Sequence, residues 1–164
     1  MASIALKGVR VLDLSRVLAA PLATQLLADL GAEVIKVERP GSGDEARTYG
    51  PPFLKTREGE ATDIAAFYLA CNRNKQSITI NHALPEGQAL CRKLVAQSDV
   101  LVENFRGGVL KKYGLDYASL REINPRLIYL SVTGFGQTGP YRHRPGYDGI
   151  FQAMGGLMSV SGHP

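Results

Sequence analysis

The chain has 164 residues, of which 45% are hydrophobic and 21% charged, and its formal net charge is +4 at pH 7. This length fits one domain, and this share of apolar residues excludes intrinsic disorder as the main state. The sequence contains no run of 18 apolar residues, which a membrane-spanning helix would need, and its N-terminus lacks a secretory pattern. We therefore expect a cytoplasmic protein without membrane partners. No run of five basic residues occurs, which argues against nucleic acid as a partner.

The N-terminal part of the chain predicts a βαβ unit. An apolar run at 9–14 is typical of a buried strand, and residues 33–38 repeat the pattern. Ser15 can cap the helix predicted over 17–30, and Gly31 suits its C-terminus. The apolar residues of this helix are spaced as on a core-facing stripe: Leu18, Leu22, Leu26, Leu27 and Leu30. A strand, a helix and a strand in this order require a parallel pair with a right-handed crossover.

The alternation continues along the rest of the chain. Residues 39–63 form a long glycine- and proline-rich stretch without a predicted element, and such long loops are often functional. Further strands are predicted at 77–80, 99–104 and 127–132, and further helices at 64–70, from Pro85 onward, at 109–113, 117–123 and 148–157. The whole pattern predicts an α/β fold with a Rossmann-like, doubly wound and mostly parallel sheet.

In a sheet of this kind, ligands bind outside the carboxyl ends of the strands. The residues at the predicted ends are Ser15-Arg16, Arg39, Asn81, Asn104-Phe105 and Thr133-Gly134. Positive side chains and amides beside an aromatic ring suit an anionic ligand that carries a flat ring. We therefore expect the binding site at this edge of the sheet.

Two glycine-rich segments imitate nucleotide-binding motifs without their context. Residues 134–139 satisfy G-x-G-x-x-G, but two prolines follow where the motif needs a helix, and no acidic residue follows on a strand to hold a ribose. Residues 41–44 lack the Gly-Lys-Ser/Thr of a phosphate-binding loop. We therefore expect no NAD.

The histidines and cysteines give no sign of a metal centre. His82, His143 and His163 lack metal-ligand spacing and are interpreted as surface or loop residues, so no metal is expected. Cys71 and Cys91 lie far apart and are interpreted as reduced thiols. Because no partner base is indicated, Cys71 is interpreted as a buried structural residue rather than a nucleophile.

Five motifs follow one another along the chain: residues 6–17 with Ala20-Pro21 behind them, 30–44, 72–78, 102–108 and 131–136. Together they resemble the family III CoA-transferases (CaiB/BaiF), which include formyl-CoA, succinyl-CoA and carnitine CoA-transferases and the related α-methylacyl-CoA racemases. The resemblance implies that residues 1–164 are the N-terminal part of a CoA-binding large domain, with the smaller domain and the C-terminal return absent. It also implies an interlocked homodimer of full-length chains.

The resemblance further implies which residues contact CoA: Arg16, Leu18, Ala19, Arg39, Ile80, Asn104, Phe105, Lys112, Gly146, Tyr147 and Asp148. Arg39 and Lys112 have the charge to pair with phosphates, although Lys112 stands where some relatives have Arg. Tyr147 stands where the racemases carry His; a phenol is a poor base at neutral pH, which favours a transferase. Asp148 could be a catalytic carboxylate or a structural residue at a helix start.

By resemblance, the reaction moves CoA between an acyl-CoA (succinyl-CoA or another dicarboxylyl-CoA) and a free carboxylic acid. In this family an Asp carboxylate attacks the thioester and forms an Asp-acyl anhydride. That Asp is expected beyond Pro164, so no catalytic residue is assigned and the 164-residue chain is expected to be incomplete and inactive. Two alternatives stay open: a racemase-like enzyme, or a non-catalytic fragment that binds CoA or associates with partner chains.

Overall fold

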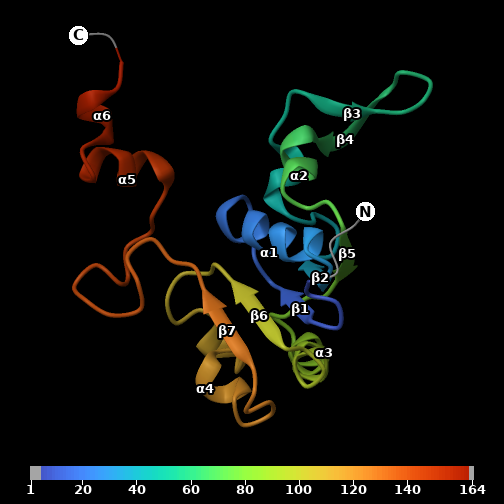
Figure 1. The fold of residues 1–164 in the computed structure, drawn as a ribbon, viewed down its shortest axis with the longest axis vertical. Coiled ribbons are helices and arrows are strands. Elements are labelled where there is room, and N and C mark those ends of the chain that lie inside the picture. Colours follow the sequence, from blue (N-terminus) through green and yellow to red (C-terminus); the bar gives the residue numbers. More distant parts are fainter. Residues whose placement is uncertain (1–4, 163–164) are drawn as a thin grey trace.

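A computed structural model describes residues 5–162, and a five-stranded parallel sheet forms the centre of this part of the chain (Figure 1). The strands are β1 (Arg10–Asp13), β2 (Glu33–Glu38), β5 (Lys75–Thr79), β6 (Val100–Glu103) and β7 (Ile128–Ser131), in the order β5-β2-β1-β6-β7. All their pairings are parallel. The chain builds one edge outward from β1 and then the other edge from β6, so the predicted doubly wound α/β sheet is confirmed.

Helices cover both faces of this sheet (Figure 1). One face carries α1 (Ala19–Asp29), and the other carries three segments: α3 (Pro85–Val95), the 3-10 helix η2 (Leu110–Tyr113) and α4 (Tyr117–Leu120). Successive residues of β1 point to opposite faces. Val11 therefore packs in the core beneath α1, and Leu12 packs in the larger core beneath α3 and α4.

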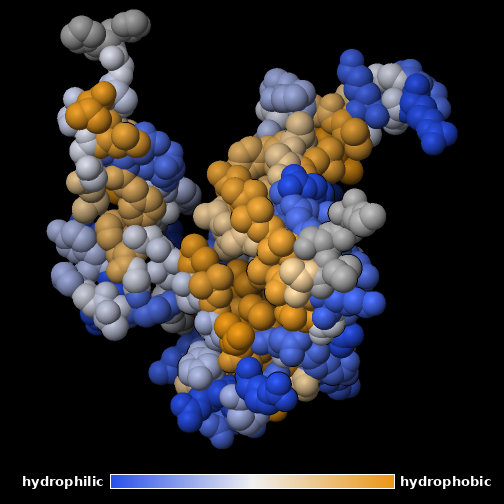
Figure 2. All heavy atoms as spheres, in the orientation of Figure 1, coloured by the Kyte–Doolittle hydropathy of each residue, from blue (hydrophilic) through white to orange (hydrophobic). Residues whose placement is uncertain are grey.

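Of the five leucines in and beside α1 that were predicted to face the core, Leu27 packs against it and the other four face outward, so the predicted core-facing stripe is wrong for those four. Four of them are between 42% and 54% exposed: Leu18, Leu22, Leu26 and Leu30. The buried side of the helix consists mainly of small and polar residues, which let the helix approach the sheet closely. Among them, Thr24 donates a hydrogen bond of 2.6 Å to the buried Asp13 of β1. These four leucines instead form part of the apolar surface seen in Figure 2.

The two ends of α1 differ in how well the sequence predicted them. Gly31 follows the helix with a φ of 100°, a left-handed conformation that glycine adopts readily, so the predicted C-terminus is confirmed. At the N-terminus, Leu18 precedes the helix and makes no side-chain cap. The predicted Ser15 cap is wrong, because the Ser15 hydroxyl donates to the Asp13 carboxylate instead.

The stretch from 39 to 63 is more regular than predicted. It contains a 3-10 helix, η1 (Glu45–Thr48), followed by an antiparallel hairpin of β3 (Phe53–Lys55) and β4 (Ala61–Ala65). These strands are too short to give a clear periodicity in the sequence. The next helix, α2 (Ala66–Ala70), begins two residues later than predicted because Ile64 and Ala65 belong to β4.

The C-terminal segment stands away from the sheet (Figure 1). It contains α5 (Asp148–Met154) and α6 (Leu157–Val160), neither of which buries a residue. One helix was predicted over 148–157, but Gly155 and Gly156 divide it, and Gly156 has a φ of 80°. Within residues 5–162, no helix combines the length and the apolar character needed to cross a membrane.

Candidate functional site

Two adjacent cavities open at the carboxyl ends of the central strands, where the sheet changes winding direction between β1 and β6. The first, called here the β2 cavity, has a volume of about 370 Å³ and is lined by residues that include Arg16, Arg39, His82 and Phe105. The second, the β6 cavity, has about 270 Å³ and shares Arg16 and Phe105 with the first. This is the position where doubly wound sheets bind ligands.

Most of the predicted site residues converge on these cavities. The β6 cavity is lined by Arg16, Ala19, Asn104, Phe105, Gly146 and Tyr147. Arg39 lines the β2 cavity. The structure does not bring the remaining four predicted residues to either cavity: Leu18, Ile80, Lys112 and Asp148. Of these, the Ile80 side chain packs in the core, which argues against a side-chain contact with a ligand. Asp148 opens α5 and accepts a hydrogen bond from Gln152, as expected of a structural residue at a helix start.

A larger hollow of about 740 Å³ runs beside β7 and α4, but it contains none of the predicted site residues. Its lining includes Ile128 and Tyr129 of β7, and Tyr117 of α4. Because it follows an outer strand of the sheet rather than the β1–β6 switch point, we place the functional site in the β2 and β6 cavities.

The Asn104 side chain holds the loop between β1 and α1 through hydrogen bonds to the main chain of Arg16. The Arg16 N–H donates to Asn104 Oδ1 at 2.9 Å, and Asn104 Nδ2 donates to the Arg16 carbonyl at 2.7 Å. The side chain predicted to contact CoA therefore positions Arg16. The Arg16 guanidinium in turn lies 4.9 Å from the centre of the Phe105 ring and forms an exposed ion pair of 2.9 Å with Glu45.

Val17 adopts a φ of 69°, which is a genuine outlier for a β-branched residue. Strain of this kind costs about 1–3 kcal/mol and persists only where neighbouring groups enforce it. Here the Val17 N–H donates to the Asp44 carboxylate at 3.1 Å, and the Cys71 thiol donates weakly to the Val17 carbonyl at 3.4 Å. The β1–α1 loop is therefore held in one conformation beside both cavities.

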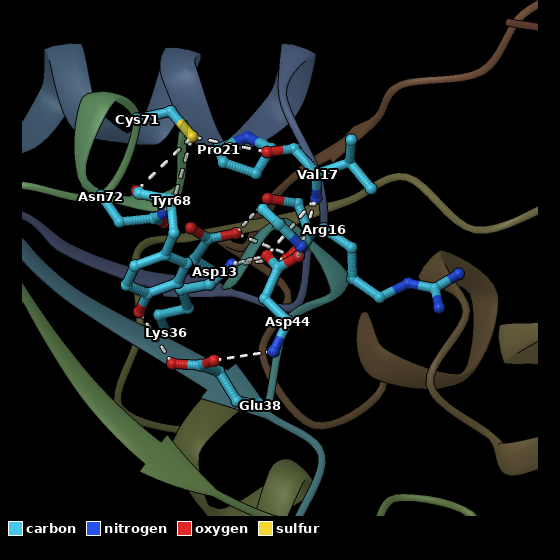
Figure 3. Close-up of polar contacts among 12 residues, drawn as sticks. Asp13, Arg16, Val17, Pro21, Lys36, Glu38, Asp44, Tyr68, Cys71 and Asn72 are labelled. Carbon is cyan, nitrogen blue, oxygen red and sulfur yellow. Dashed lines mark hydrogen bonds and ion pairs between the residues drawn. The ribbon is translucent and has the colours of Figure 1, made fainter. Parts of the chain in front are cut away.

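A buried ion pair supports this loop from behind (Figure 3). Lys36 Nζ lies 2.8 Å from the Asp44 carboxylate, and each side chain is only 1% exposed. The same Nζ donates to the Ser15 carbonyl at 2.8 Å. The Arg16 side chain points away from this network (Figure 3) and lines both cavities, where its guanidinium pairs with Glu45. The sequence carried one signal for the ion pair: Lys36 interrupts an otherwise apolar strand, Val34-Ile35-Lys36-Val37.

A second buried ion pair lies beneath α1. Lys75 Nζ is 3.0 Å from the Asp13 carboxylate and also donates to the Pro21 carbonyl and to Asn72 Oδ1. Burial lowers the pKa of Lys75 despite the charge of Asp13. Burial also raises the pKa of the Cys71 thiol, so the interpretation of Cys71 as a buried structural residue rather than a nucleophile is supported.

Glu38 is buried but surrounded by donors. Arg47 forms an ion pair with it at 2.7 Å, and further bonds come from the Tyr68 and Ser77 hydroxyls and from the Asp44 N–H. Burial opposes ionisation, but these hydrogen bonds together outweigh it and lower the Glu38 pKa to about 2. The charged carboxylate thereby fixes the chain that follows β2 against η1 and α2.

This lowered pKa predicts an acid-dependent loss of stability. A carboxyl group that binds its proton less readily when folded stabilises the protein above its unfolded pKa, and that stability is lost as the pH falls toward its folded pKa. The stability advantage of wild type over Glu38→Gln is expected to be about 3 kcal/mol larger at pH 6 than at pH 2. Urea unfolding of both proteins between these pH values measures it; a difference that stays constant with pH would contradict the prediction.

Arg39 follows β2, is exposed and has no side-chain hydrogen bond or ion pair among the described residues. Sequence reasoning missed His82, which it placed on the surface or in a loop. The structure shows His82 in a loop, half-buried, as part of the wall of the β2 cavity. Of the other histidines, His143 is exposed and His163 lies outside the described residues.

The fold and these cavities define a Rossmann-like α/β protein with an arginine-lined site at its winding switch point. The model of CoA-transferase family III matches residues 6–164. The chain therefore belongs to CoA-transferase family III, as the five motifs predicted.

Two relatives and one solved structure show the extent of this similarity. The chain is 57% identical over 159 residues to a succinate–glutarate CoA-transferase of Agrobacterium fabrum, covering 97% of this chain and 40% of that relative. It is 52% identical over 157 residues to a succinyl-CoA:glutarate CoA-transferase of Mus musculus, covering 96% and 34%. A crystal structure of a CaiB/BaiF family protein from Brucella suis matches with a TM-score of 0.90 and 56% identity, covering 97% of this chain and 41% of that one. This chain thus spans less than half the length of these relatives.

Proposed function

We propose that this chain supplies the CoA-binding part of a CoA-transferase that moves CoA from succinyl-CoA, or another dicarboxylyl-CoA, to a free carboxylic acid. The observation that carries the proposal is the convergence of Arg16 and Arg39 beside the Phe105 ring at the β1–β6 switch point. Guanidinium groups bind phosphates, and an aromatic ring can stack against a base. The dicarboxylate donor is supported by the names of the relatives in Agrobacterium fabrum and Mus musculus.

The transfer itself requires a carboxylate nucleophile. An Asp oxygen attacks the thioester carbonyl, the carbon–sulfur bond breaks, and CoA leaves as the thiolate with an Asp-acyl anhydride remaining. The thiolate then attacks the Asp carbonyl of the anhydride, which releases the donor acid and leaves CoA on the Asp as a thioester. The incoming carboxylate displaces the thiolate from this thioester and forms a new anhydride with the Asp. The thiolate finally attacks the acyl carbonyl of the new acid, which gives the new acyl-CoA and frees the Asp carboxylate. Within residues 5–162, the carboxylates that line the two cavities, Glu38, Asp44 and Glu45, are each engaged in an ion pair. In line with the family resemblance, the nucleophile is proposed to be an Asp beyond Pro164.

The 164-residue chain is accordingly expected to bind CoA without transferring it. Calorimetric titration with CoA measures the first property, and an assay with succinyl-CoA and glutarate measures the second. Heat of binding without product is the expected result. Absence of CoA binding by the folded chain would contradict the assigned site, and turnover by the chain alone would contradict the assignment of the nucleophile.

A racemase-like activity is less well supported, because Tyr147 at the β6 cavity offers a phenol where the racemases carry the imidazole of His. Association of two chains is supported by exposed apolar residues on α1 and on the C-terminal segment, among them Leu26, Met154 and Val160. Sedimentation of the full-length chain tests the proposed homodimer. The buried free thiols of Cys71 and Cys91 fit the reducing conditions of the cytoplasm.

A further inference from the structure

His82 occupies a position in the β2 cavity that neither the motifs nor the proposed reaction uses. Its ring stands edge-on to two aromatic rings, 5.4 Å from the Phe105 centroid at 80° and 5.6 Å from the Tyr113 centroid at 69°. These two contacts fix the orientation of the imidazole ring. No hydrogen bond engages its ring nitrogens among the described residues, so they can bind a ligand in the cavity.

Arg16 and Arg39 line the same cavity as His82. Among the described residues of this lining, Arg39 alone carries a charge without an ion pair. The acids of the cavity are already engaged: Glu38 with Arg47, Asp44 with Lys36, and Glu45 with Arg16. Other titratable groups on the elements packed nearby are Tyr113 and Lys112 on η2 and the exposed Glu86 in the first turn of α3.

These surroundings disfavour a charged imidazole in the absence of a ligand. Burial lowers the pKa of His82, and the positive charges of Arg16 and Arg39 lower it further. The imidazole is therefore neutral near pH 7 in the free protein. An anion bound between these three side chains raises the pKa of His82, because its negative charge favours the imidazolium form.

We propose that His82 is a further ligand-binding residue, which holds a phosphate of CoA together with Arg16 and Arg39 and takes up one proton from solvent as CoA binds. This inference rests on the proposed function, because it requires CoA in the β2 cavity. The proton adds to the free ring nitrogen, and the resulting N–H donates to a phosphate oxygen. Because the imidazolium donates a charge-assisted hydrogen bond to the phosphate, CoA should bind up to about tenfold more tightly at low pH than it binds to a protein without this group.

Calorimetry of the 164-residue chain in buffers of different ionisation enthalpy measures the protons taken up per CoA bound. The variants are His82→Gln, His82→Phe, which keeps an aromatic ring against Phe105 and Tyr113, and the control His143→Gln in an exposed loop. The 3′-phosphate of CoA also titrates near pH 6. 3′-Dephospho-CoA, which lacks that group, therefore serves as a second ligand whose own charge stays constant.

We expect wild type and His143→Gln to take up the same fraction of a proton between pH 6 and 7, and both His82 variants to lose that uptake. The affinity of the His82 variants should fall relative to wild type at pH 6 and differ less at pH 8. CoA binding with unchanged proton uptake in folded His82→Phe would overturn the role of His82 while leaving the proposed function intact. Absence of CoA binding by folded wild type would instead overturn the proposed function, and this inference with it.

Discussion

Replacing Lys36 with methionine is expected to lower the free energy of unfolding by about 3–5 kcal/mol, because it leaves the Asp44 carboxylate buried without its cation. The same change removes the hydrogen bond to the Ser15 carbonyl, so the β1–α1 loop loses a support together with the ion pair. Urea unfolding at pH 7 measures the loss, and CoA titration of the folded fraction reports on the loop.

The matched control for Lys36→Met is Glu33→Gln, which breaks the exposed ion pair of 2.8 Å between Arg10 and Glu33. Exposed pairs contribute little, so this variant should unfold within about 1 kcal/mol of wild type. A double-mutant cycle that adds Asp44→Leu then isolates the coupling between Lys36 and Asp44. The idea of a strongly coupled buried pair fails if Lys36→Met is no less stable than Glu33→Gln.

Replacing Arg39 with alanine is expected to weaken CoA binding by about tenfold to a hundredfold, which corresponds to the loss of charge-assisted hydrogen bonds to phosphate. Stability should change by less than about 0.5 kcal/mol, because the Arg39 side chain is exposed and makes no ion pair among the described residues. Calorimetric titration with CoA gives the affinity, and thermal unfolding gives the stability.

Arg57 provides the control for Arg39, since it is an exposed arginine in the turn of the β3–β4 hairpin and lines neither cavity. Arg57→Ala removes the same charge from the chain, so it corrects for the change in net charge. If both variants bind CoA equally well, Arg39 is not a phosphate contact and the β2 cavity is not the CoA site.

The sequence predicted the sheet well because strands buried on both faces leave a simple record. Val11-Leu12 and Val100-Leu101-Val102 form the apolar centres of two of these strands, and Gly31 marks the end of the helix between β1 and β2. The order of strands and helices then limits the topology, since each parallel crossover must be right-handed. The same regularity placed Arg16, Asn104 and Phe105 at strand ends, and the structure brings these three together.

The orientation of α1 could not be obtained in this way. Leucines at a spacing of four residues mark an apolar face, but the helix buries Ala20, Thr24 and Ala28 instead. Spacing identifies a face without saying what covers it, and here a buried carboxylate, Asp13, binds the polar side of the helix. The pattern predicts the helix correctly and predicts the wrong face for packing on the sheet.

The composition and the motifs of the sequence by themselves determined the fold class and the family. Only the tertiary structure decided which charged groups work at the site and which are structural. Lys36 and Arg39 lie close together in the sequence, yet one is buried in an ion pair and the other is free at a cavity. The physical reason is that the charge of a side chain is a local property, whereas its burial and its partners come from segments such as η1 and β6 that only folding brings near.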